Sequence, residues 1–278
     1  MLKKMLLTLP VICLLFIADA QELNTPAPSP PQTIKQNFAL SSIELSYSRP
    51  GMKGRKVFGD LVPFGKVWRT GANSATTITF GDDVTIGGTK VPKGEYGLLT
   101  IPDKDNWTVI ITKQLDVTNP TAYKAENDVA KATVKAMTMK DPVETFTMQF
   151  ANIKAGSCEL HIMWENTAVA LPITTDVDSK VMAQINESMN KDNHPYFESA
   201  LYYMTNGKDL NQALAWFDKA AAQQPDAFWV EHQRANCLAK LGKKDLAKAS
   251  AQKSKELATK AGNDDYVRLN DKLLLQLK

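Results

Sequence analysis

The side chains best suited to bind an anion are concentrated between Tyr47 and Asn73. Arginine carries a planar guanidinium that can donate two parallel hydrogen bonds to a carboxylate or phosphate. An indole ring nearby can stack on a sugar. The segment combines these groups with a carboxylate and an amide, in Arg49, Arg55, Asp60, Lys66, Trp68, Arg69 and Asn73. We identify these residues as the candidate ligand-binding site.

The same residues allow a second interpretation, in which they stabilise the loop that carries them. Repeated glycines and prolines make regular structure unexpected here, and aromatic side chains such as Phe58 and Phe64 can anchor the loop. Arg55 and Arg69 would then donate to loop carbonyls and to Asp60, and Trp68 would fill the core. The sequence leaves both interpretations open.

Other motifs with known chemistry are incomplete in this sequence. Gly59 to Lys66 is similar to a phosphate-binding loop, but one residue too many separates its glycines and Val67 stands where a Ser or Thr would hold magnesium. The histidines His161, His194 and His232 fall in three different predicted elements, whereas a zinc site needs convergent ligands. No Gly-x-Ser-x-Gly motif is present. We therefore expect no metal and no cofactor.

The elements that must position the candidate site are strands. Alternating hydrophobic residues between Gly, Pro and Asp turns predict an antiparallel β-sandwich over residues 34–175. The expected strands are Ile43–Ser48, Thr76–Phe80, Asp83–Ile86, Tyr96–Ile101, Trp107–Thr112, Val129–Met137, Glu144–Phe150, Cys158–Trp164 and Ala168–Thr174. The alternation also predicts that Leu160, Ile162 and Trp164 share one face of their strand.

A specific set of short motifs runs through this region: Tyr47–Pro50, Lys53–Arg55, Phe58-Gly59, Pro63–Asn73, Gly94–Leu98 and Trp107–Ile110. In these motifs the region resembles the family called domain of unknown function 2911. The long arginine–glycine segment makes the resemblance specific, and it covers about residues 34–175. It implies a compact β domain in a secreted protein of the Bacteroidetes type. It implies no reaction, because the family has no established activity.

After Thr175 the composition changes to Ala, Lys, Leu and Gln, which predicts a helical domain over residues 178–278. The expected helices are Asp178–Asn190, Asp209–Gln224, Ala227–Leu241, Leu246–Lys260 and Asp264–Leu277. Together with the β-sandwich they make an α+β protein of two domains.

A repeat of about 34 residues relates the helices and resembles the tetratricopeptide repeat. The first copy carries a turn glycine, small close-packing residues, an aromatic and a closing proline, and the second copy keeps part of the pattern: Gly207, Ala213, Phe217, Ala220, Pro225, Gly242 and Ala247. Two repeats are fewer than the three usually needed, so we expect another element to cover an exposed end.

The N-terminus is typical of an exported protein. Lys3 and Lys4 precede an apolar run and the small residues Ala18 and Ala20, which predicts a signal peptide over residues 1–20. Residues 21–33 are rich in proline and read as an extended linker. Cleavage would leave two cysteines, Cys158 and Cys237, and whether they pair is open.

The overall balance of 33 Lys+Arg against 30 Asp+Glu gives no reason to expect a nucleic-acid partner, and no membrane span is expected in the mature chain. We expect a periplasmic or secreted, non-catalytic protein whose sandwich binds a ligand and whose repeats bind a protein or peptide. The alternatives are an envelope hydrolase or isomerase acting through the Arg49–Asn73 loop, and a purely structural β domain. Catalysis would need an acid or base beside Arg55 and Arg69.

Overall fold

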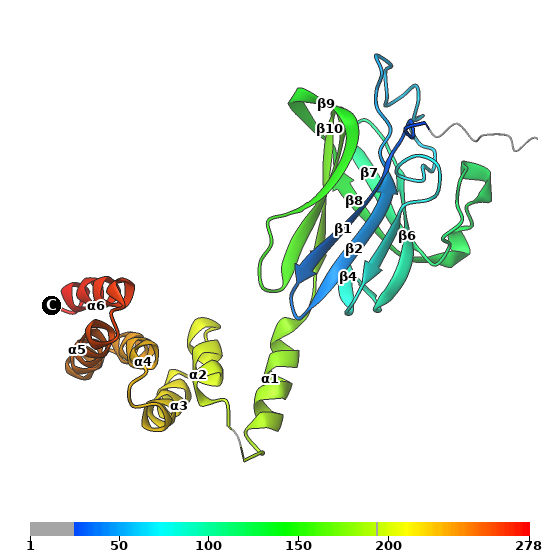
Figure 1. Ribbon diagram of the computed structural model, residues 1–278. Coiled ribbons are helices and arrows are strands. Elements are labelled where there is room, and N and C mark those ends of the chain that lie inside the picture. The colour runs from blue at the N-terminus through cyan, green and yellow to red at the C-terminus, as the bar shows by residue number, and fades with distance from the viewer. Residues whose placement is uncertain (1–24, 193) are drawn as a thin grey trace, which may run out of the picture. The chain divides into compact units, whose positions relative to one another are not determined.

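A computed structural model of the protein describes residues 25–192 and 194–278 (Figure 1). The chain divides into two compact units between Thr175 and Asp176, a β unit and a helical unit. The expected signal peptide lies outside the described residues, as does the beginning of the expected linker. None of the described helices is long and apolar enough to cross a membrane.

The β unit consists of two antiparallel sheets, as expected. The first sheet has the order β1 (Pro31–Phe38), β2 (Ser41–Ser48), β3 (Thr77–Phe80), β6 (Gly94–Ile101), β7 (Asn106–Thr112) and β8 (Asp128–Lys135). The second has the order β5 (Thr89–Val91), β4 (Val84–Ile86), β10 (Ser157–Thr174) and β9 (Met137–Ala151). Two short 3-10 helices, η1 (Pro120–Ala122) and η2 (Ala125–Asn127), lie between β7 and β8.

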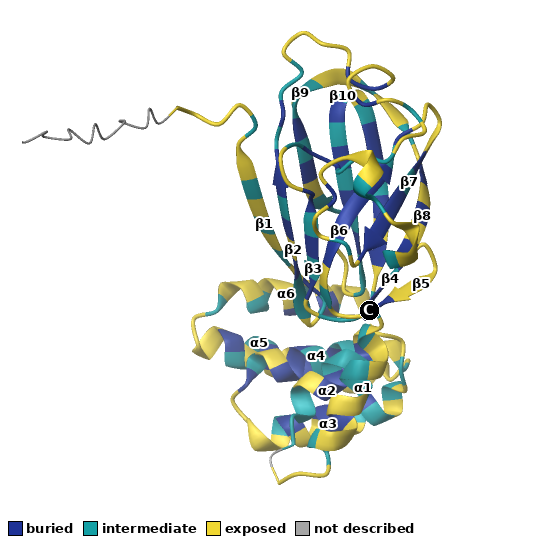
Figure 2. Cartoon of the chain, turned by 90° about the vertical axis from the view of Figure 1, so that its right-hand side faces the viewer, coloured by how far each residue is buried: buried dark blue, intermediate teal, exposed yellow. Residues whose placement is uncertain are grey.

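One hydrophobic core lies between the two sheets. It takes Leu45 and Ile78 from the first sheet and Phe146 and Leu160 from the second, all fully buried. Burial alternates along the strands because successive side chains point to opposite faces (Figure 2). The predicted shared face of Leu160, Ile162 and Trp164 is confirmed, since each is buried.

The strand boundaries differ from the prediction at β10. The two expected strands, Cys158–Trp164 and Ala168–Thr174, form one continuous strand. Glu165 has a φ of 53° and the pairing with β9 shifts on either side of it, so the chain makes a bulge there instead of a turn. The loss of alternation around Glu165 predicts the end of a strand there. Pairing with the long strand β9 continues on both sides of Glu165, so the chain stays in the sheet.

The proline-rich linker was predicted to extend to residue 33, but β1 begins at Pro31. Proline lacks a backbone N–H and is tolerated at the first residue of an edge strand. β1 is such an edge strand, with β2 as its neighbour in the sheet. The last residues of the expected linker are therefore part of the fold.

The helical unit contains the described helices α1 (Val177–Ser188), α2 (Tyr196–Thr205), α3 (Leu210–Gln223), α4 (Phe228–Lys240), α5 (Lys244–Lys260) and α6 (Asp264–Gln276). Neighbours along the chain pack together from α2 to α6. Gly207, Gly242 and Gly262 follow α2, α4 and α5 with φ of 67°, 74° and 69°. This left-handed conformation ends a helix and favours glycine.

The repeat residues have the burial that close helix packing requires. Ala213, Phe217 and Ala247 are fully buried and Ala220 is 1% exposed. Gly207 and Gly242 are exposed in the turns, and Pro225 follows α3. Small side chains at these positions let the helices approach one another.

The two cysteines of the described residues are free and buried, Cys158 in the β core and Cys237 in the helical core. The disulfide that the sequence left open is not formed. Each thiol behaves as a small hydrophobic side chain within its own unit.

Candidate functional site

The segment between β2 and β3, residues 49–76, is held by an aromatic cluster at the β core. The Trp68 ring stacks on Trp164 with centroids 5.9 Å apart, and it meets Phe146 edge-on at 5.0 Å. Phe58 packs edge-on against Trp107 at 4.8 Å. The Trp68 Nε1 donates to the Gly71 carbonyl. Trp68 is therefore fixed in position, as the core-filling interpretation predicted, while part of it stays exposed.

The backbone beside Trp68 is strained. Thr70 is β-branched and fully buried, yet its φ is 56°. Its hydroxyl donates to the Trp68 carbonyl and lies 3.1 Å from Thr100 Oγ1, while its carbonyl accepts from Thr76 Oγ1 at 2.6 Å. Strained residues tend to persist where the surrounding structure over-determines them, often at functional sites. The carbonyl of the preceding residue, Arg69, also accepts from the Thr76 N–H at 3.2 Å, so hydrogen bonds hold the backbone on both sides of Thr70.

Two of the predicted arginines stabilise the loop. Arg49 Nε donates to the Phe146 carbonyl at 3.1 Å and its Nη2 to Thr147 Oγ1 at 2.8 Å. Arg55 Nε and Nη2 donate to the carbonyls of Met52 and Gly51 at 2.8 and 2.7 Å. The pairing with Asp60 that was predicted for Arg55 and Arg69 is not formed by either, since both donate to backbone carbonyls. Asp60 is exposed.

Arg69 is arranged differently from Arg49 and Arg55. Its Nη1 donates to the Thr118 carbonyl at 2.5 Å, across to the segment that connects β7 and β8. Its Nε is buried and has no acceptor among the described residues. Asn73, at the end of the segment, donates to the Ser29 carbonyl and to Ser48 Oγ, both at 3.3 Å.

Residues 113–127, which contain the Thr118 acceptor of Arg69, were not predicted to be part of the site. Buried Val117 joins it to Leu99 and Ile110 on the outer face of the first sheet. Asn119 caps η1 by accepting from the backbone N–H groups of Thr121 and Ala122. The Asn-Pro pair at 119–120 was the available signal, since it favours a turn. The contact with Arg69 had no signal in the local sequence.

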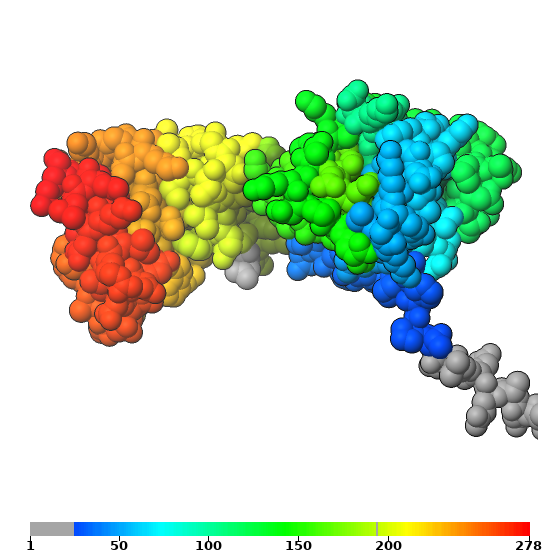
Figure 3. Space-filling view, turned by 90° about the horizontal axis from the view of Figure 1, so that it is seen from above, coloured from blue at the N-terminus to red at the C-terminus, as the bar shows by residue number. Residues whose placement is uncertain are grey.

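A cavity of about 410 Å³ lies between the two segments, which lie side by side on the β unit (Figure 3). Trp68 and Trp164 are among its lining residues, and Leu61 and Pro120 add apolar wall. Arg55, Lys66 and Arg69 supply positive charge. The structure thus brings four predicted residues to one cavity and leaves Arg49, Asp60 and Asn73 outside its lining. The volume suits a small organic ligand.

His161 is paired with Glu159 on the outer side of β10, with Nε2 and Oε2 2.8 Å apart. Hydrogen bonds from His161 and Asn152 lower the pKa of Glu159. His161 is thus a strand histidine with a hydrogen-bond partner. Within residues 25–192 and 194–278 no group of His, Cys, Asp and Glu side chains could hold a metal ion.

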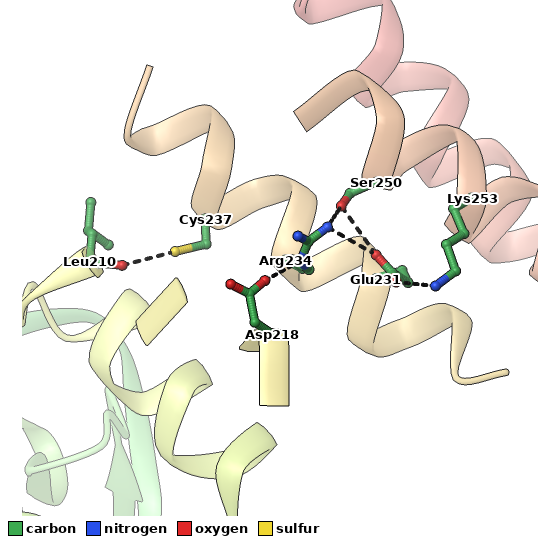
Figure 4. A network of polar contacts seen from close by, with 7 residues as sticks. All are labelled: Leu210, Asp218, Glu231, Arg234, Cys237, Ser250 and Lys253. Carbon is green, nitrogen blue, oxygen red and sulfur yellow. Dashed lines mark hydrogen bonds and ion pairs between the residues drawn. The ribbon is translucent and has the colours of Figure 1, made fainter. Parts of the chain in front are cut away.

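A second polar cluster joins three helices of the helical unit (Figure 4). Glu231 of α4 is 3% exposed, and its carboxylate binds Lys253 Nζ at 2.7 Å and accepts from Ser250 Oγ at 3.2 Å. Arg234 donates to Asp218 of α3 and to Ser250 of α5. The charges compensate one another, so the cluster acts as a link between helices.

Residues 29–173 match the family model described as protein of unknown function, DUF2911. The match spans more than half of the chain. This chain belongs to the DUF2911 family. No curated protein and no solved structure matches the sequence of this chain.

The DUF2911 match confirms the resemblance expected over residues 34–175 and extends it to residue 29. The matched range includes almost the whole β unit and both segments that wall the cavity. It ends before α1, so the tetratricopeptide resemblance of the helices stays a prediction. The family description names no activity. A function for the β unit therefore has to be inferred from the cavity and the residues that line it.

Proposed function

We propose that this DUF2911 protein is an exported, non-catalytic binding protein whose β unit holds a small polar or anionic ligand. The observation that carries the proposal is the cavity between residues 49–76 and 113–127. Its wall combines indole rings with the positive charge of Arg55, Lys66 and Arg69. Such a wall offers apolar contact to the body of a ligand and charge-assisted hydrogen bonds to its polar end.

The lining favours binding over catalysis. Among the described lining residues there is no carboxylate, imidazole or thiol, and Lys66 is the one ammonium. Arg55 already donates to two backbone carbonyls. A hydrolase or isomerase needs a positioned acid or base at the reacting atoms, and this wall offers few groups for that role. The envelope enzyme is therefore the weaker of the two functions.

The proposal extends to location and to the helical unit. The signal-like residues 1–20 support export to the periplasm or beyond. The glycine turns after α2, α4 and α5 and the buried Ala213, Phe217 and Ala247 support a tetratricopeptide-like array. Arrays of this kind offer extended surfaces for proteins and peptides. We assign the helical unit to contact with a protein partner.

The ligand proposal is tested by thermal shift and calorimetry on the chain that begins at Gln21, against sugars, organic acids, nucleotides and peptidoglycan fragments. Ala72→Phe would fill the cavity, because Ala72 lines it. Ala155→Phe is the matched control at an exposed turn position. A compound that binds the wild type and Ala155→Phe but not Ala72→Phe supports the proposal. Equal binding to all three proteins, or no binding by any compound, contradicts it.

Export and partner contact need separate tests. N-terminal sequencing of the protein from the envelope fraction should begin at Gln21, and a chain that starts at Met1 would contradict export. A partner that copurifies with the full chain should be lost from a chain ending at Thr175, while cavity binding is retained. A partner that stays with the shortened chain would contradict the role of the helices.

A further inference from the structure

The three arginines of residues 49–69 differ in which edge of the guanidinium is used. In arginine, Nε–H and one Nη2–H point the same way and form a fork that matches two acceptor oxygens. In Arg49 and in Arg55 this fork is closed by acceptors of the protein's own fold. In Arg69 the fold binds the other nitrogen, Nη1, through the Thr118 carbonyl.

Within the described part of the chain, the fold therefore leaves the Nε–Nη2 edge of Arg69 without an acceptor. Its Nε is buried with no acceptor, and no hydrogen bond to its Nη2 is formed by the described residues. A buried donor left without a partner destabilises a fold. Nε has no surface open to solvent, so side-on binding requires the cavity wall beside Arg69 to move. Arg69 and Thr118 both line that cavity.

We infer that the ligand of this cavity carries a carboxylate, whose two oxygens accept side-on from Nε and Nη2 of Arg69. This inference rests on the proposed function. A carboxylate is planar, singly charged and offers two oxygens at the spacing of the fork. A phosphate dianion would call for more donors, and the other cations at the wall are exposed Lys66 and the already bonded Arg55.

The other residues that line the cavity indicate what kind of group the carboxylate is attached to. Trp68, Trp164, Leu61 and Pro120 are apolar or aromatic surfaces of the same cavity. A ring or short hydrocarbon attached to the carboxylate would lie against them and exclude water from the ion pair, which strengthens it. The ligand class is thus a small organic acid with an apolar or ring-shaped body.

The test compares acids with their neutral amides: phenylacetate with phenylacetamide and cyclohexanecarboxylate with its amide, with phenyl phosphate as the phosphate probe. Calorimetry is run on the full mature chain. Each acid should bind at least about tenfold more tightly than its amide, the ratio expected for one charge-assisted hydrogen bond. The Arg69 Nε–H proton should also shift downfield with the acid and not with the amide.

Arg69→Gln removes the charge and the fork, and Arg69→Lys keeps the charge but removes the fork. Both should weaken acid binding by about tenfold or more. Lys140→Gln is the control, at an exposed cation outside the cavity. Circular dichroism and thermal unfolding establish that each variant is folded, and the Nε–H shift tests the contact in the wild type should either variant unfold.

If Arg69→Lys binds the acids as tightly as the wild type does, the side-on contact through Nε and Nη2 is wrong. If phenyl phosphate binds more tightly than the acids, the assignment of the ligand as a carboxylate is wrong. Equal binding of acids and amides that Ala72→Phe still blocks would overturn this inference and leave the proposed function standing. No binding by any of these probes would overturn this inference, and no binding by the wider set of compounds named under the proposed function would overturn both.

Discussion

At the scale of single residues, the role of an arginine depends on the acceptors that the fold brings to it. Arg49, Arg55 and Arg69 all lie in one segment, yet only the first two have their Nε edges closed by the protein. Between Trp68, which donates to the Gly71 carbonyl, and Thr70, which has a positive φ, Arg69 donates to the Thr118 carbonyl. Residue type identified the candidates, and the contacts separated loop-stabilising arginines from the one with an open edge.

The cysteines should be unreactive in the folded protein. Burial, with a smaller effect of the Glu159 carboxylate, raises the pKa of Cys158 to about 11, and burial raises the pKa of Cys237. Thiolates are the reactive species, so Ellman's reagent should label neither thiol rapidly at pH 8 in the chain that begins at Gln21. Both should react on unfolding. Fast labelling without denaturant would contradict the buried positions.

Lys253 should stabilise the helical unit because it neutralises the buried carboxylate of Glu231. Lys253→Met removes this partner from the Glu231 side chain, which is 5% exposed. The substitution should lower the free energy of unfolding by about 1–3 kcal/mol. Lys255→Met on the same helix breaks the more exposed pair with Asp271 and should lower it by less than about 1 kcal/mol. Urea unfolding measures both, and equal losses would contradict the importance of burial.

At the scale of elements, turns and capping residues set where the helices begin and end, and a bulge lets β10 continue where its alternation is interrupted. Asp176, Asp209 and Asn263 cap α1, α3 and α6 through side-chain oxygens. The caps and the glycine turns are local signals, so α1 and α3 to α6 lie close to their predicted ranges, whereas no range was predicted for α2. The continuity of β10 through Glu165 depends on its long pairing with β9, and the sequence prediction divided that strand.

Helix α1 is joined to α2 and its following turn by Asp178. Its carboxylate binds Lys208 Nζ at 2.6 Å and accepts from Tyr202 at 2.9 Å. These contacts lower the pKa of Asp178, with Lys208 as the larger cause. A lowered folded pKa contributes stability above the ordinary value near 3.8, and this stability is lost as the pH falls through the folded pKa.

Asp178→Asn should therefore lower the melting temperature of the helical unit at pH 7, and the difference from wild type should shrink toward pH 3. Asp226→Asn is the control at an exposed acid. A constant difference at all pH values would contradict the titration. In the alkaline range, burial and then the Asp178 hydrogen bond raise the pKa of Tyr202 to about 12, so its phenol should ionise late.

At the scale of the whole molecule, the chain contains two units with separate cores. The β core draws on residues of the β unit, and the helical clusters draw on residues of the helical unit. Separate cores of this kind usually fold as separate cooperative units. The cavity belongs to the β unit, so ligand binding and partner contact can be separated by experiment.

Calorimetry should show two unfolding transitions. Phe217→Ala should lower only the helical transition and Leu45→Ala only that of the β unit, because each side chain is fully buried in its own core. The expected loss is about 3–5 kcal/mol for Phe217→Ala and about 2–5 kcal/mol for Leu45→Ala. A cavity ligand should raise only the β transition. One transition that both variants shift would contradict the separation.

The division into a β half and a helical half and most strand and helix positions could be predicted from the sequence alone, as could the segment for which we propose a ligand site. Alternation, helical spacing, glycine turns and caps act over a few residues, so they can be read locally. Only the tertiary structure decided that Thr118 binds Arg69 and that the segment 113–127 closes the cavity. These contacts join residues far apart in the chain, and no local pattern carries them.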